Sequence, residues 1–182
     1  MKKGNKKANP VKKATPVKYT PEENTNSRVE EPALVYGIPS ASTLEILKFL
    51  GGKSGFKAIQ GIHDFIAMIR KGLTRKSLDH FMNATGLTAD EMAAIMHTST
   101  RTLRRYTAET ILNPDQSERV IELARLYSRG EEVFGNLNLF KDWMNATILS
   151  LGNKKPKEFL DTSIGINILM DELGKIEHGI FA

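Results

Sequence analysis

The sequence predicts a mainly all-α protein that begins with a basic tail. From about residue 40 onward, apolar residues recur at helical spacing, and glycines follow these segments where helices commonly end. Side chains that cap helix starts precede several of the segments. With 182 residues, 40% of them hydrophobic, the chain can bury a core in one compact domain or in two small ones.

The positive charge is concentrated at the start of the chain. The net charge is +5, but residues 1–19 contain seven lysines and no acidic residue, so the remainder carries −2. A segment of Lys, Asn, Pro and Thr with few large apolar side chains cannot offset the entropy lost on ordering, so we expect residues 1–33 to be disordered. This tail either tethers the protein to DNA phosphates or only keeps it in solution, and both readings stay open.

The composition argues against an enzyme. The chain has no cysteine, which excludes disulfides, thiolate metal sites and cysteine nucleophiles. Its four histidines lack the i,i+4 partner of a helical metal site, and no catalytic grouping is evident. The first residues lack the apolar region of a signal peptide, and no apolar run is long enough to span a membrane. We expect a cytoplasmic protein with no catalytic residue, cofactor or metal, and no membrane association.

Three helices are expected in the first half of the body. Each segment carries an apolar stripe at helical spacing. Gly51, Gly72 and Gly86 follow the three stripes and mark their ends. The predicted helices are Ser40–Leu50, Asp64–Lys71 and Arg75–Thr85.

Two short helices joined by a sharp turn follow, at about residues 88–106. Thr88 and Glu91 have the spacing of a capping box, which starts the first helix, and Ser99 caps the second. Only His97 and Thr98 lie in the turn, and the arrangement resembles the helix-turn-helix of repressors. His97 stands where these motifs usually have glycine, so we expect a distorted turn with a left-handed residue.

The second short helix presents arginines to solvent. Leu103 and Tyr106 are expected to point inward, which leaves the polar side chains outside. A guanidinium group can bind guanine O6 and N7 with two hydrogen bonds, or hold a phosphate. An alternative is that this face is only solvated or forms a dimer contact. The predicted DNA-binding residues are Ser99, Thr100, Arg101, Thr102, Arg104 and Arg105.

A long helix is expected next. Asn113 and Gln116 can cap its start, with Pro114 at the first helical position. We expect it to end at Gly130, followed by a break at residues 131–135. Its predicted buried stripe is Val120, Leu123, Ala124 and Tyr127.

The last third contains a short helix and a final helix. Phe140, Trp143 and Met144 mark the short helix, in which the single tryptophan is expected to anchor the core. The final helix is expected from Thr162 to Gly174. Gly165 in its first turn suggests close packing against Trp143 or Phe140.

From about Asp64 onward the chain resembles the Xre/ParS/MbcA family of antitoxins, whose toxins carry the RES fold. The similarity rests on the order and spacing of motifs over about two thirds of the chain, although Asn145-Ala146 replaces a common proline turn and Asn153 replaces a glycine. The motifs are Arg101-Thr-Leu-Arg-Arg105, Ser117-Glu-Arg-Val120, Leu123-Ala-Arg125, Glu132-Val-Phe-Gly135, Trp143, Leu151-Gly152, Pro156, Leu160-Asp-Thr162, Gly165 and Leu173-Gly-Lys-Ile-Glu-His-Gly179.

The resemblance implies a type II antitoxin in which residues 34–130 carry the helix-turn-helix and residues 131–182 bind a toxin. It implies two activities, namely neutralisation of a cognate RES-domain toxin that consumes NAD, and repression of its own operon through operator DNA. A homodimer is expected, because one helix-turn-helix contacts only a half-site. The alternative is a transcriptional regulator whose C-terminal module serves only dimerisation.

The end of the chain is the predicted toxin-binding segment. It is more apolar than a free tail usually is. An NAD pocket must be cationic to hold the pyrophosphate, so Glu177 and the carboxylate of Ala182 are expected to take the place of those anions and the segment to occlude the pocket. The segment comprises Lys175, Ile176, Glu177, His178, Gly179, Ile180, Phe181 and Ala182.

Overall fold

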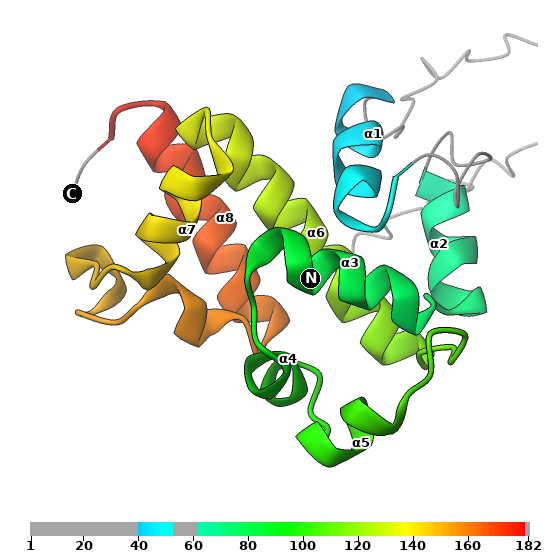
Figure 1. Cartoon of the computed structure of the whole chain (residues 1–182). Coiled ribbons are helices and arrows are strands. Elements are labelled where there is room, and N and C mark those ends of the chain that lie inside the picture. Colours follow the sequence, from blue (N-terminus) through cyan, green and yellow to red (C-terminus); the bar gives the residue numbers. More distant parts are fainter. Residues whose placement is uncertain (1–39, 53–61, 181–182) are drawn as a thin grey trace, which may run out of the picture. The chain divides into compact units, whose positions relative to one another are not determined.

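The computed structural model describes residues 40–52 and 62–180, and every element in these ranges is helical (Figure 1). The mainly all-α prediction is therefore confirmed. The tail predicted at residues 1–33 lies outside the described residues, as do Phe181 and Ala182. The elements are α1 (Ser40–Phe49), α2 (Ile62–Lys71), α3 (Arg75–Thr85), α4 (Ala89–Ile95), α5 (Thr100–Arg105), α6 (Pro114–Phe134), α7 (Leu137–Asn145), the 3-10 helices η1 (Leu149–Leu151) and η2 (Pro156–Phe159), and α8 (Ser163–Glu177).

Helix α6 is central among the described helices, because it contacts α1, α2, α3, α7 and α8. The side chains that these helices bury join into one hydrophobic core. Tyr127 of α6 lies in its middle, with ring centroids 6.3, 5.6 and 5.2 Å from those of Phe49, Phe81 and Phe140. Burial raises the pKa of Tyr127 far above its ordinary value, so this side chain stays neutral at physiological pH.

The predicted capping residues hold the helix starts. Thr88 and Asn113 each form a capping box, and Gly86 ends α3 in the left-handed conformation with φ 78°. These local bonds satisfy backbone groups that a helix end leaves without a partner. Helix α3 has the predicted bounds, and its cap Thr74 was not foreseen.

Two glycine predictions were wrong. Gly130 does not end α6, which continues to Phe134 and ends at Gly135 with φ 68°. A Cβ at Gly130 would lie 2.5 Å from the Phe140 ring, so this glycine permits close packing instead. Gly165 is closely packed as predicted, but the atoms nearest to a Cβ there belong to Phe159 and Thr162 and not to Trp143 or Phe140. Because α6 continues past Gly130, the two predicted domains share one helix.

None of the helices in the described ranges combines the length and apolar character needed to cross a bilayer.

Candidate functional site

Helices α4 and α5 form the predicted helix-turn-helix. His97 in the turn has φ 50°, so a non-glycine residue holds the left-handed conformation as expected. The amide of Thr98 donates to the carbonyl of Ala93 at 2.9 Å, and Ala93 is buried where the two helices approach. The Thr100 hydroxyl donates to the Asp90 carboxylate at 2.7 Å and joins the starts of the helices. The two helices are therefore locked to each other by bonds inside the motif.

The exposed side of α5 is basic. Leu103 is fully buried, as predicted, and Tyr106 is half-buried. The exposed arginines have no hydrogen bond or ion pair to another described residue, so their guanidinium groups are available to a ligand. These arginines are Arg101, Arg104 and Arg105.

The predicted hydroxyl contacts of α5 are engaged within the protein. Ser99 caps α5, and its Oγ lies 2.7 Å from the Thr102 hydroxyl. Thr100 is half-buried and bonded to Asp90. The structure therefore places all six predicted DNA-binding residues on one short helix and its cap, and among them only the arginines have side chains that make no bond to another described residue.

Arg75 anchors the other end of α5, and the sequence patterns did not reveal it. Its guanidinium donates to the carbonyl of Leu103 and also pairs with Asp79 at 2.8 Å within α3. The Arg75 side chain is largely buried. A cation at the carbonyl end of a helix is electrostatically favourable, so Arg75 stabilises α5 from the core side.

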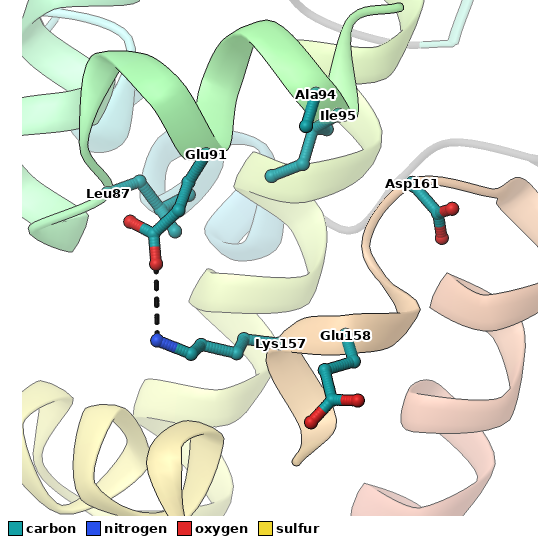
Figure 2. Close-up of a pocket in the computed structure, with 7 residues that line it drawn as sticks. All are labelled: Leu87, Glu91, Ala94, Ile95, Lys157, Glu158 and Asp161. Atoms are coloured by element: carbon teal, nitrogen blue, oxygen red, sulfur yellow. Dashed lines mark hydrogen bonds and ion pairs between the residues drawn. The ribbon is translucent and has the colours of Figure 1, made fainter. Parts of the chain in front are cut away.

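A pocket of about 340 Å³ lies between α4 and η2 (Figure 2). Leu87, Glu91, Ala94 and Ile95 line it on the side of α4, and Lys157, Glu158 and Asp161 line it on the side of η2. The Lys157 ammonium crosses it to reach Glu91 Oε1 at 3.2 Å. This ion pair connects the first helix of the helix-turn-helix with the region that precedes α8.

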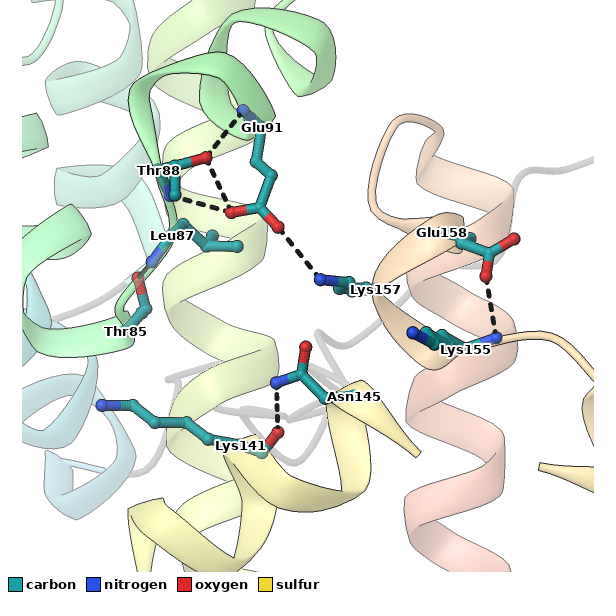
Figure 3. Close-up of polar contacts among 9 residues, drawn as sticks. All are labelled: Thr85, Leu87, Thr88, Glu91, Lys141, Asn145, Lys155, Lys157 and Glu158. Carbon is teal, nitrogen blue, oxygen red and sulfur yellow. Dashed lines mark hydrogen bonds and ion pairs between the residues drawn. The ribbon is translucent and has the colours of Figure 1, made fainter. Parts of the chain in front are cut away.

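The Glu91 carboxylate binds both Thr88, at the start of its own helix, and Lys157 of η2 (Figure 3). Its Oε2 accepts from the Thr88 amide and the Thr88 hydroxyl, both at 2.9 Å, while Oε1 accepts from Lys157. Partial burial acts to raise the pKa of Glu91, but the bonds from Thr88 and Lys157 outweigh it and lower the pKa. Glu91 is thus held as a carboxylate at the start of α4.

The described part of the predicted toxin-binding segment, residues 175–180, lies at the end of α8. Lys175, Ile176 and Glu177 form the last helical turn, so the expectation that this helix ends at Gly174 was wrong. His178 follows as the C-terminal cap, and Gly179 has φ 67°. The described chain ends at Ile180, whose side chain is 60% exposed.

Two sets of polar contacts hold this last turn. Arg129 of α6 pairs with Glu177, and it also binds Glu132 at 2.8 Å. On α8, the largely buried Glu172 accepts from Lys175 Nζ at 2.6 Å and from the Ser150 hydroxyl at 2.8 Å. The bond from Lys175 holds the pKa of Glu172 below its usual range, and Ser150 adds to this effect.

Two family models match adjacent parts of the chain. Residues 64–125 match the antitoxin Xre-like helix-turn-helix domain, and residues 129–179 match the antitoxin Xre/MbcA/ParS C-terminal toxin-binding domain. The first therefore includes α4 and α5, and the second includes Arg129 and the end of α8.

Two proteins named Antitoxin Xre are similar to parts of the chain. An Antitoxin Xre from Yersinia enterocolitica is 31% identical over 80 residues, which are 43% of this chain and only 54% of that protein. An Antitoxin Xre from Photorhabdus laumondii is 28% identical over 128 residues, which are 69% of this chain and 86% of that protein.

One solved structure is also similar. It is the crystal structure of the M. tuberculosis MbcT–MbcA toxin–antitoxin complex, in which one chain has a TM-score of 0.44 and 18% sequence identity. The similarity covers 59% of this chain and 96% of that one. On the two family models and the named relatives, this chain belongs to the Xre/MbcA/ParS family of antitoxins.

Proposed function

We propose that this antitoxin neutralises a cognate RES-domain toxin that consumes NAD, by covering the toxin's NAD pocket with the end of α8 and the residues up to Ala182. The observation that carries the proposal is the position of Ile180. This apolar side chain is 60% exposed, and it follows directly after the stretch that matches the toxin-binding domain. Phe181 comes next in the sequence, so two large apolar residues follow the matched stretch directly. An apolar pair at a helix end is suited to burial in a partner's pocket.

The structure changes which group we assign to the NAD pocket. Glu177 is paired with Arg129, and its carboxylate therefore helps to hold α8 in place. A carboxylate already paired with arginine is a poorer substitute for the NAD pyrophosphate, because it would have to exchange one cation for another. We therefore assign Glu177 to holding α8 in place, and Ile180 and Phe181 to apolar contact with the pocket.

A truncation after Gly179 tests this proposal. Removal of residues 176–182 would be a less specific test, because it would also remove Glu177 from its pair with Arg129 and shorten α8 itself. Removal of residues 180–182 keeps Glu177 and every residue of α8. Co-expressed with the toxin, the truncated chain should fail to protect cells at a dose at which the full chain protects them. Equal protection at equal dose would rule out occlusion by this segment.

We further propose that the protein represses its own operon, with α5 binding operator DNA as part of a homodimer. The support is the exposed face of Arg101, Arg104 and Arg105, whose donors are not used within the described structure. Guanidinium groups on a short helix can contact guanine edges or phosphates, and two copies are needed to read two half-sites.

The arginines provide the test of operator binding. Substitution of Arg101 or Arg105 by alanine should weaken operator binding roughly tenfold in a gel shift, because such contacts are worth about 1–3 kcal/mol. Arg125, an exposed arginine on α6, provides the matched control and should have no effect. An unchanged shift for both α5 variants would reassign this face to another role, such as dimer contact.

A further inference from the structure

The last turn of α8 has little apolar burial to hold it. Leu173 is the last fully buried side chain of the helix. Beyond it, Lys175, Glu177 and His178 are exposed, and Ile176 is only half-buried. Helix ends whose side chains are solvated fray readily, because their final carbonyls have no helical partner. The polar contacts of this turn therefore decide how well it is ordered.

Arg129 supplies the contact that reaches across to α6. Its two terminal nitrogens bind different carboxylates, with Nη1 on Glu132 and Nη2 on Glu177. Glu132 lies on the same helix as Arg129 and orients the guanidinium, while Glu177 is 48 positions away in the sequence. The arginine thus fixes the final turn of α8 at one point on α6, and Figure 1 shows these two helices side by side.

The backbone then sets a definite exit from the helix. The amide of Gly179 donates to the carbonyl of Ile176 at 3.1 Å, and the amide of Ile180 donates to that of Lys175 at 2.8 Å. With Gly179 at φ 67°, these two bonds form a Schellman motif. The motif needs the last turn to be intact, because both acceptors lie in it. The direction in which Ile180 leaves the helix therefore depends on the contact between Arg129 and Glu177.

We propose that Arg129 is a positioning residue for toxin binding. It acts through Glu177, by holding the end of α8 in the conformation that presents Ile180 and the residues after it. This inference rests on the proposed function of that segment. A preformed end loses less conformational entropy when it binds, so the pair contributes to affinity without itself contacting the toxin.

A double-mutant cycle on the full chain tests the inference. Arg129→Met and Glu177→Gln should each weaken toxin binding by roughly three- to tenfold, and the double variant should be no weaker than either single variant. Arg129→Lys, which keeps the charge, should restore part of the affinity. Arg125→Met, one turn earlier on α6 and exposed, is the matched control and should bind as the wild type does. Isothermal titration with purified, catalytically inactive toxin provides the dissociation constants.

Two further measurements separate positioning from a loss of folding. The side chains of Arg129 and Glu177 are 28% and 38% exposed, and ion pairs this accessible contribute little to stability. The melting temperature and the operator shift of both variants should therefore match those of the wild type. Wild-type toxin affinity in Arg129→Met would overturn the inference. A loss of affinity in Arg129→Met with none in Glu177→Gln would overturn it too, because it would indicate that the arginine contacts the toxin directly.

The outcome is distinguishable from failure of the proposed function. If removal of residues 180–182 leaves the toxin affinity unchanged, the proposed function fails. If that truncation abolishes binding while Arg129→Met has no effect, only the positioning role fails.

Discussion

The helix-turn-helix and the end of α8 are held in place by different means. In the helix-turn-helix, the buried side chains of Met92, Ala93 and Leu103 anchor two helices whose starts are capped by near neighbours in the sequence. At the end of α8, apolar anchoring stops at Leu173, and the final turn depends on ion pairs with residues of other elements or of the preceding turn. The helix-turn-helix, with the exposed face of α5, is the first surface, and it is rigid through packing. The end of α8, from Lys175 to Ile180, is the second surface, and it is ordered through polar contacts that are individually weak.

Removal of a core side chain should damage the first surface most. Leu103 is fully buried under α5, and Leu103→Ala should lower the free energy of unfolding by about 3 kcal/mol through lost burial and the cavity that remains. Urea denaturation measures this loss, and operator binding should fall with it. At a temperature where the variant is still folded, its toxin affinity should equal that of the wild type. An equal loss of both affinities would mean that the two surfaces are not held independently.

The two glycines near the end of α8 should respond to alanine in opposite directions. Gly179 has φ 67°, where a side chain costs about 1 kcal/mol, although a Cβ there would meet no atom within 4 Å. Gly174 is inside the helix and also has free space, so alanine there should stabilise the helix by up to about 1 kcal/mol. Toxin affinity should therefore fall by roughly fivefold for Gly179→Ala and be kept or raised for Gly174→Ala. If both substitutions act alike, the conformation at Gly179 does not govern how Ile180 and the residues after it are presented to the toxin.

The ion pair between Lys157 and Glu91 should have the smallest effect, and a pH-dependent one. Both side chains are about one third exposed, so Lys157→Met should cost less than about 1 kcal/mol at pH 7. The folded-state pKa of Glu91 is lowered from its ordinary value of 4.5, so the stability that it contributes is present above pH 4.5 and is lost as the pH falls through the lowered pKa. Thermal melts at pH 7 and pH 3 should show the difference between wild type and variant shrinking toward zero. A difference that grows on acidification would contradict this assignment.

Local signals in the sequence predicted the first surface well. Thr88 with Glu91, and Ser99 with the short turn before it, define the helix starts through bonds that span three residues. The inward position of Leu103 follows from helical spacing within the same segment. Because these features depend on neighbouring residues, one sequence is sufficient to predict them.

The contacts of the second surface could not be predicted in the same way. Arg129 with Glu177 and Lys157 with Glu91 join residues 48 and 66 positions apart, and charged residues on helices have many possible partners. Gly130 was misread for a related reason. Glycine after a stripe is typical of a helix end, and only the position of Phe140 in space shows that it serves close packing here. Long-range packing therefore accounts for most of what the sequence left open.

Helix α6 also limits how this protein can be recombined. The stretch between the two family matches, residues 126–128, lies in the middle of α6 and not in a linker. An α-helix turns by about 100° per residue, so one residue inserted there would rotate everything downstream by about that angle relative to the helix-turn-helix. The faces of α6 that meet α3 and α8 would then no longer be in phase. Chimeras that exchange the toxin-binding part between relatives must therefore keep the length of α6 unchanged, whereas a flexible connection would tolerate insertions.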